Sequence, residues 1–296
     1  MRILLAIDPT EASKNVICEA ATRPWPVKTE LRILHVVDIS GMGRFAELLE
    51  EEKRAGEALV RAAAEGLSGP GRAVTTESLV GFPRTAISDY AKSWKADLIL
   101  VGSRGRGALA RFLLGSVAQA VLRTAPCSVE IVRRETQPNI SPRKGLKILL
   151  GTDGSQSAGA AAKSVASRPW PVGTLVKVVS AVELLMPENA TSISSPAPVY
   201  PASLLEEVWS DARKRAHDAV AEAQKTLAAA GLKILDGESA PDGDPRAVLL
   251  DQAREWGADL IVLGSHGRRG LDRFLMGSVS ESVALHAHCS VEVIRD

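Results

Sequence analysis

The 296-residue sequence has few of the features that mark secreted, membrane-bound or nucleic-acid-binding proteins. Three cysteines are too few for a disulfide scaffold and favour a reducing compartment, the cytoplasm. No apolar run approaches the ~20 residues of a membrane span, and the apolar run at the N-terminus is too short for a signal peptide. The 36 basic and 35 acidic residues nearly cancel. We therefore expect a soluble cytoplasmic protein that binds neither nucleic acid nor membrane.

Two standard phosphate-binding motifs are also absent. No Gly-Lys-Ser/Thr follows a glycine-rich loop, which excludes a Walker A sequence. Gly105, Gly107 and Ala110 formally fit the dinucleotide pattern G-x-G-x-x-A, but a second copy of this stretch has Arg269 at the middle position. A single fit of this kind is weak evidence, and we give it no weight.

What the sequence does contain is one stretch that occurs twice, at Val101–Leu122 and Leu263–Leu285. In each copy Gly-x-x-Gly is followed by nine residues and then by Gly-Ser. These positions are Gly102, Gly105, Gly115 and Ser116 in the first copy and Gly264, Gly267, Gly277 and Ser278 in the second. An apolar run opened by an aspartate precedes each copy, and apolar residues at helical spacing follow it. The pattern predicts a strand, a glycine-rich loop and a helix.

Two interpretations of this motif are open. A helix that starts at Gly-Ser presents backbone N–H groups and a positive dipole end to phosphate oxygens, and glycine lets the backbone approach a ligand closely. Alternatively, Ser116 with Gln119 and Ser278 with Glu281 fit capping boxes, which start a helix without any ligand. Two glycine clusters that frame the same nine-residue span twice favour the anion site.

The rest of the chain repeats with the motif. It predicts two α/β domains at residues 1–134 and 146–296, joined by a polar, proline-broken linker at 135–145. In the first domain we expect strands at 2–7, 31–37, 72–79, 97–101 and 127–133. We expect helices at 11–22, 44–67, 84–94 and after Gly115. This alternation predicts βαβ crossovers and a parallel sheet in each domain.

The second copy is longer than the first. The repeat offset is 145 residues at Arg23-Pro-Trp-Pro-Val, which recurs at Arg168, and 162 residues at the glycine motif, so 17 residues have been gained between them. The gain falls mainly at Met186–Ser203, which is rich in Pro, Ser and Ala. We expect an extended surface loop there, either a lid over the second site or an idle insertion. Trp25 and Trp170, each between prolines, are expected to anchor their loops against the preceding helix.

The topology predicts where a ligand would bind. In doubly wound sheets, ligands bind beyond the carboxyl ends of the strands, where the chain direction reverses. Asp8 and Asp153 follow the first strand of each domain, and Gly102 and Gly264 end the fourth. If strands one and four are neighbours, these residues share a crevice. The aspartate then either caps a helix or shapes a turn, or it bonds to a base or sugar.

These features resemble the universal stress protein family in its tandem, ATP-binding form, over nearly the whole chain. The resemblance implies two doubly wound, Rossmann-like sheets of strand order 3-2-1-4-5, each with ATP or another adenine nucleotide, accompanied by Mg²⁺, in its crevice. It assigns the base contacts to Asp8 and Asp153 and to the backbone of Val36 and Ala181. It assigns the ribose and phosphate contacts to Gly102, Gly105, Gly115, Ser116 and Val117, and to Gly264, Gly267, Gly277, Ser278 and Val279.

The sequence departs from the family pattern in two places. Ser180-Ala181-Val182-Glu183 stands where the first copy has the family-like His35-Val36-Val37-Asp38. Serines 128 and 290 replace the proline that often follows the cysteine of the last strand, which restores an N–H group to that strand. In the family this edge strand pairs domains, so we expect an internal pseudo-dimer that buries two open sheet edges. A further homodimer is left open.

No catalytic constellation stands out: there are no paired carboxylates and no nucleophile–base pattern. We expect Cys127 and Cys289 to pack at strand starts, and no metal site, since His286, His288 and Cys289 lack a fourth ligand. The function expected is adenine-nucleotide binding with a stress-response or signalling role, through nucleotide-dependent conformation or an unknown protein partner. The alternatives are a slow Mg²⁺-dependent ATPase or phosphoryl-transfer enzyme, and an interaction module without nucleotide.

Overall fold

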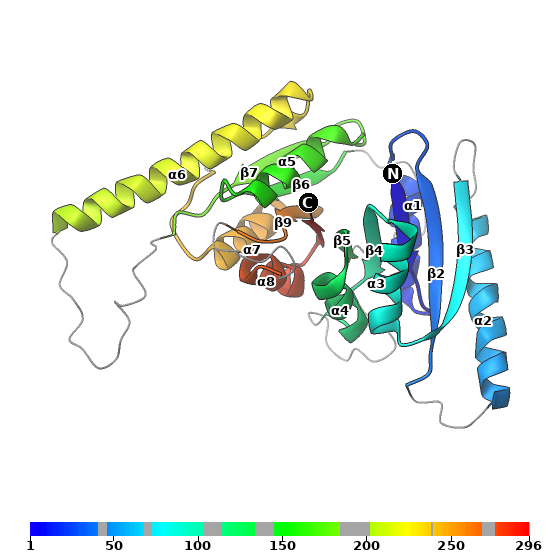
Figure 1. The fold of residues 1–296 in the computed structure, drawn as a ribbon. Helices are drawn as coiled ribbons and strands as arrows, with labels where there is room; N and C mark the ends of the chain where they lie inside the picture. Colours follow the sequence, from blue (N-terminus) through cyan, green and yellow to red (C-terminus); the bar gives the residue numbers. More distant parts are fainter. Residues whose placement is uncertain are drawn as a thin grey trace, which may run out of the picture.

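One ten-stranded sheet runs through both halves of the chain in the order β3-β2-β1-β4-β5-β10-β9-β6-β7-β8, with helices on its faces (Figure 1). This is a computed structural model. It describes residues 1–40, 46–67, 73–103, 114–133, 145–183, 202–237, 239–267 and 276–295. Most of the predicted linker and loop, residues 135–144 and 186–201, therefore lies outside the described residues. Ala202 and Ser203 begin helix α6, so the predicted loop is shorter than Met186–Ser203 at that end.

The first half follows the predicted alternation. Its strands are β1 (Arg2–Ala6), β2 (Glu30–Asp38), β3 (Ala73–Gly81), β4 (Leu98–Gly102) and β5 (Ser128–Val132). Its helices are α1 (Glu11–Thr22), α2 (Ala46–Glu65), α3 (Pro83–Trp94) and α4 (Ser116–Thr124). All strand pairs within this half are parallel. The order 3-2-1-4-5 is confirmed, and β1 lies beside β4 as the crevice requires.

The second half repeats this arrangement. Its strands are β6 (Lys147–Gly151), β7 (Leu175–Val179), β8 (Lys233–Ile234), β9 (Leu260–Gly264) and β10 (Ser290–Ile294). Its helices are α5 (Gln156–Ser167), α6 (Ala202–Ala229), α7 (Pro245–Trp256) and α8 (Ser278–His286). Strands β4 and β9 are apolar and buried throughout, because helices cover both faces of the sheet.

The halves join through β5 and β10, which pair antiparallel with Glu130 opposite Glu292. The predicted internal pseudo-dimer is therefore confirmed. The serines that replace the family proline contribute to this seam: Ser128 Oγ accepts from the Arg295 N–H and Ser290 Oγ from the Arg133 N–H, each at 3.2 Å. One hydrophobic core spans the seam on the α3, α4, α7 and α8 side, and a separate core in each half lies on the other side.

Charged side chains are buried behind this seam. Arg23 donates from Nε to Glu19 at 2.8 Å and from Nη2 to Glu130 at 2.9 Å. Arg168 donates to both carboxylate oxygens of Glu292, at 2.8 and 3.0 Å. All five residues are buried. Three carboxylates thus face two guanidinium groups, and burial makes each pairing obligatory because an unpaired buried charge is costly.

The repeated tryptophans anchor their loops as predicted. Trp25 donates its indole N–H to Ala20 O at 3.0 Å, and Trp170 donates to Val165 O at 2.8 Å, each near the end of the preceding helix. The Arg23 guanidinium also stacks on both indole rings, 4.9 and 5.3 Å from their centroids. One cation therefore ties the two repeated segments together.

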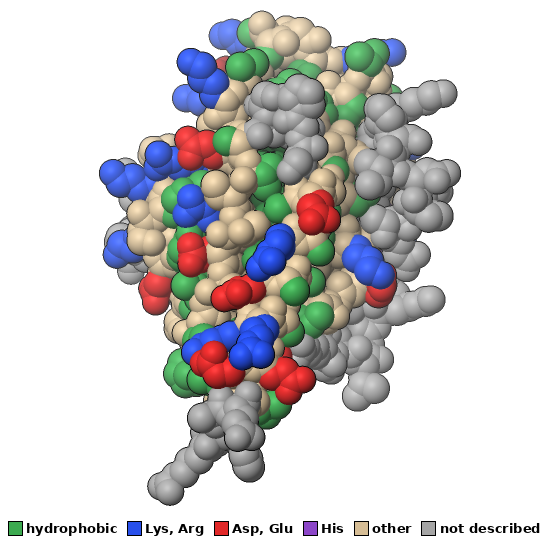
Figure 2. Space-filling model, turned by 90° about the vertical axis from the view of Figure 1, so that its right-hand side faces the viewer, with side chains coloured by type: hydrophobic (Ala, Val, Ile, Leu, Met, Phe, Trp, Pro, Cys, Tyr) green, Lys and Arg blue, Asp and Glu red, His purple; other side chains and the backbone are tan. Residues whose placement is uncertain are grey.

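The molecular surface matches the nearly balanced composition. On the side of the molecule at the right of Figure 1, Lys and Arg side chains are interspersed with Asp and Glu (Figure 2). Among the described residues no helix is both long enough and apolar enough to cross a membrane.

Candidate functional site

Both glycine motifs place a helix start directly against the end of a strand. In the second half, Gly277 N–H donates to Ser265 O at 2.7 Å just beyond β9, and α8 begins at the next residue. In the first half, Gly115 N–H donates to Ser103 O at 2.8 Å, and α4 begins at Ser116. The exposed N-termini of α4 and α8 therefore lie at the carboxyl edge of the sheet, as predicted.

The capping-box interpretation is wrong. Gly115 and Gly277 are the N-cap residues, with extended backbone, and their carbonyls accept the first helical bonds from Gln119 and Glu281. Ser116 and Ser278 are thus the first helical residues, one position too far along to act as N-caps. The cross-loop bond of each glycine fixes this register. The serine hydroxyls lie beside the first helical N–H groups, which have no intrahelical acceptors.

Several motif glycines are required by the packing of the protein on itself. A Cβ on Gly264 would lie 2.6 Å from the Ser157 backbone carbon in α5, and a Cβ on Gly102 3.1 Å from the Ala12 backbone in α1. A Cβ on Gly277 would lie 3.0 Å from the Cα of His266. Glycine at these positions lets the loop fold tightly between strand and helix, which is a reason for glycine independent of any ligand.

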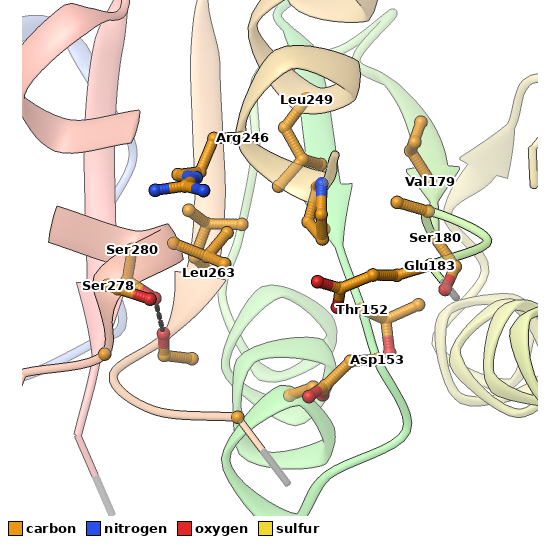
Figure 3. Close-up of a pocket in the computed structure, with 18 of the residues that line it drawn as sticks. Thr152, Asp153, Val179, Ser180, Glu183, Arg246, Leu249, Leu263, Ser278 and Ser280 are labelled. Atoms are coloured by element: carbon orange, nitrogen blue, oxygen red, sulfur yellow. Dashed lines mark hydrogen bonds between the residues drawn. The ribbon is translucent and has the colours of Figure 1, made fainter. Parts of the chain in front are cut away.

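A cavity of about 510 Å³ opens at this edge of the second half (Figure 3). Its size lies within the range typical of small-molecule sites. All seven residues predicted for the second site line it: Asp153, Ala181, Gly264, Gly267, Gly277, Ser278 and Val279. Leu249 and Leu263 form an apolar part of the wall, while Ser278 and Ser280 lie along the α8 side. The structure therefore brings the seven residues together around one space.

The backbone of Ala181 faces the cavity rather than the neighbouring strand. Ser180 and Val182 donate their N–H groups to Ser239 and Pro241 at 2.8 and 2.9 Å. Because successive residues of an extended strand direct these groups to opposite edges, the Ala181 N–H and C=O point toward the β6 side. There β6 has already ended at Gly151, so these groups are directed into the cavity that Ala181 lines.

The two predicted aspartates shape turns. Asp8 Oδ1 accepts from Thr10 Oγ1 at 2.5 Å and from Ser13 Oγ at 2.8 Å. Asp153 Oδ1 accepts from the Ser155 N–H at 2.9 Å. Neither is a helix N-cap, since Thr10 and Ser155 occupy those positions. The second oxygen of Asp153 would lie 2.8 Å from a Cβ on Gly267, so this carboxylate lies against the glycine loop, and both residues line the cavity.

Sequence reasoning missed four charged residues that line the cavity. Arg215 of α6 and Arg246 of α7 line the cavity, as do Glu183 and Asp244. Arg246 is held by Asp244, with Nη2 2.8 Å and Nε 3.1 Å from carboxylate oxygens. These bonds lower the pKa of Asp244. The sequence Asp244-Pro-Arg246 is typical of a helix start and could have indicated that Arg246 lies at this edge of the sheet. Nothing in the sequence places Arg215, because packing sets the rotation of α6.

The first half has the same framework. Asp8, Val36, Gly102, Gly115, Ser116 and Val117 occupy places equivalent to those in the second half. Val36 lies beyond the end of β1, since the Ile7 N–H donates to Leu34 O at 2.9 Å, two residues before Val36. Gly105 lies outside the described residues.

The two cysteines at matched positions of the repeat are structural. Cys127 and Cys289 are buried in the core that spans the seam, as expected, and burial raises the pKa of each thiol to about 12. A thiol with such a pKa is a poor nucleophile near neutral pH. Within the described ranges no group of three or more His, Cys, Asp or Glu side chains is placed to hold a metal ion.

Comparison with known proteins identifies relatives over the whole chain. The model of the universal stress protein family matches residues 1–133 and again residues 146–295. A universal stress protein of Mycolicibacterium smegmatis is 31% identical over 212 residues, which cover 72% of this chain and 65%, just under two thirds, of that relative. Universal stress protein Rv2005c of Mycobacterium tuberculosis is 28% identical over 304 residues, covering 99% of this chain and 96% of the relative.

A solved structure shares the fold over the whole chain. A universal stress protein from Archaeoglobus fulgidus matches 99% of this chain and 96% of its own with a TM-score of 0.65 at 20% identity. A universal stress protein solved in complex with cAMP matches 46% of this chain and 98% of its own at 26% identity, with a TM-score of 0.35. The bound nucleotide is a property of that protein.

Proposed function

This chain belongs to the universal stress protein family, and we propose from that premise that it binds ATP or another adenine nucleotide in two crevices, one in each half. The observation that carries the proposal is the cavity in the second half, which all seven residues predicted for that site line. The proposed role is a stress response or signalling, in which occupancy changes domain packing or the choice of a protein partner.

The residues of the cavity fit such a ligand. The apolar side chains of Leu249 and Leu263 suit the faces of a base, and the Ala181 N–H and C=O can pair with its edge. The first N–H groups of α8, beside Ser278, suit phosphate oxygens. Asp153 would contact the base or sugar, and Mg²⁺ would accompany the phosphates, as the family resemblance implies.

A matched pair of substitutions tests the two sites separately. Ser116→Asp and Ser278→Asp each place a carboxylate where a phosphate is proposed to bind. A carboxylate in the first helical turn stabilises the helix, so the fold should be retained. Calorimetric titration of ATP with Mg²⁺ should show two sites in the nucleotide-stripped wild type, one in each variant and none in the double variant.

The controls separate the alternatives. Ser116→Asn and Ser278→Asn keep a neutral polar group at the helix start, so they should weaken ATP binding only slightly. Competition with cAMP measures how much of the affinity comes from the triphosphate. Absence of binding by any adenine nucleotide would overturn the proposal and leave an interaction module. ATP turnover that is lost in a Ser→Asp variant would instead favour the slow enzyme.

A further inference from the structure

Helices α4 and α8 begin at the two candidate sites, and the last turn of each accepts hydrogen bonds from an arginine of the opposite half. Arg295, at the end of β10, donates from Nη2 to Leu122 O at 2.8 Å and to Arg123 O at 3.1 Å, in the last turn of α4. Arg133, at the end of β5, donates from Nη2 to Ala284 O at 2.5 Å and to Leu285 O at 3.1 Å, in the last turn of α8.

The two arrangements are copies of each other. Arg133 and Arg295 are separated by the same 162 residues as the glycine motifs, and so are their acceptors. Each arginine is also fixed through its backbone N–H by the serine hydroxyl at the start of the partner strand. The side chains are therefore placed by the β5–β10 seam, which exists only when both halves are packed together.

The helices are short enough for one end to affect the other. Each has nine residues, which corresponds to a length of about 13 Å. The last carbonyls of a helix lack intrahelical donors, and a cation there stabilises the helix through the same dipole that attracts an anion to its start. The arginine thus holds the helix rigid and oriented while its first N–H groups face the site.

We propose that Arg295 is a positioning residue for the first-half nucleotide site and Arg133 for the second-half site, so that each site is completed by the other half of the chain. This rests on the proposed nucleotide function. Neither arginine contacts the ligand: each acts through the helix whose first turn does.

One further contact between the two halves has no equivalent in the other copy of the repeat. Arg123 on α4 lies 2.5 Å from Glu281 in the first turn of α8, whereas the equivalent positions of the other crossing are Leu285 and Gln119. The Arg123–Glu281 ion pair therefore ties the two site-bearing helices directly to each other across the seam.

The test measures each site alone. Ser278→Asp leaves the first site and Ser116→Asp leaves the second, and Arg133→Met or Arg295→Met is added to each background. We expect Arg295→Met to weaken ATP at the first site by about threefold to tenfold, and Arg133→Met to do the same at the second. Each arginine variant should leave the site in its own half within about twofold. Each variant is the matched control for the other, because both remove the same contacts from one seam.

Two further measurements separate positioning from general destabilisation. Arg133→Lys and Arg295→Lys keep the cation at the helix end and should restore part of the lost affinity. Hydrogen exchange followed by mass spectrometry, without nucleotide, should show faster exchange in α4 but not α8 for Arg295→Met, and the reverse for Arg133→Met. Equal effects on both helices and both sites, or none on either, would overturn the inference. If the wild type binds no nucleotide, the proposed function fails, and the exchange pattern alone decides whether the arginines order the helices.

Discussion

At the scale of single residues, glycines of this chain differ in whether their surroundings require a glycine. Gly264 is closed in by the backbone of Ser157, so a methyl group there must displace α5 from the strand end. Gly159, near the start of α5, has no atom within 4 Å of the place where its Cβ would be. Composition alone does not distinguish these two positions, because the difference depends on a neighbour more than a hundred residues away.

This contrast yields a prediction for stability. Gly264→Ala should destabilise the protein by about 2 kcal/mol or more through overpacking, whereas Gly159→Ala should stabilise it by about 0.5–1 kcal/mol through helix propensity. Urea denaturation followed by circular dichroism measures both. If Gly264→Ala proved as stable as the wild type, the close packing of β9 on α5 would not constrain the motif, and a ligand would be the better reason for that glycine.

At the scale of secondary structure, the elements are predictable from the sequence, whereas the caps of the helices that follow the glycine motifs are not. Helix α1 has the predicted bounds, and the parallel sheet follows from the repeated strand–helix alternation, whereas the strand order was implied by the family resemblance. The capping boxes failed because Ser-x-x-Gln/Glu specifies a helix start only when the serine itself is the last non-helical residue. The cross-loop bond from Gly277 to Ser265 decides that point, and such a contact is not visible in local sequence.

The same limit applied to the site. The residues that follow strands β6 and β9 were predictable, because parallel strands bring their carboxyl ends to one edge. Arg215 was not, because its position on the cavity wall depends on how α6 packs against β7. Arg215 is not part of the repeated glycine motif, so the repeat does not place it.

A second prediction concerns equivalent helix starts that differ in sequence. Asp244 caps α7 by accepting from the N–H groups of Arg246 and Ala247, while Phe82 stands at the N-cap of α3 without a side-chain bond. Phe82 is 56% exposed, so replacing it removes little buried surface. Phe82→Asp should stabilise the protein by about 1 kcal/mol and Asp244→Ala should destabilise it by about as much. Thermal unfolding of both variants tests this; a loss of stability in Phe82→Asp would show that the ring has a packing role.

At the scale of the whole molecule, the two halves are joined by a buried cluster with more acids than bases. Glu19, Glu130 and Glu292 face Arg23 and Arg168 from two strands and from the ends of α1 and α5. Burial and the neighbouring carboxylates of Glu19 and Glu292 raise the pKa of Glu130 to about 7, although Arg23 acts in the opposite direction. The seam therefore carries one proton more at pH 5 than at pH 8.

The sign of the pH effect follows from linkage. The Glu130 pKa is higher in the folded protein than its ordinary value of 4.5, so between about pH 4.5 and 7 the folded state holds a proton that the unfolded state releases. This contribution to stability is complete below that window and is lost as the pH rises through it. The upper limit of the loss is on the order of 3 kcal/mol. Other titrating groups add their own dependence, so the contribution of the cluster must be isolated by a variant.

The variant Glu19→Gln isolates the contribution of the buried cluster. Its amide oxygen can still accept from Arg23 Nε, while the excess negative charge disappears. The position equivalent to Glu19 in the second half is Ser164, which shows that this charge is not needed to build the loop. We expect the pKa of Glu130 to fall and the free energy of unfolding to vary less between pH 5 and 8 than in the wild type. Urea titrations across this range measure the difference, with Glu11→Gln, on the exposed face of the same helix, as the matched control. If Glu19→Gln left the slope unchanged while the control behaved as the wild type, the proton would not reside in this cluster, and the packing of the two halves would not respond to pH through it.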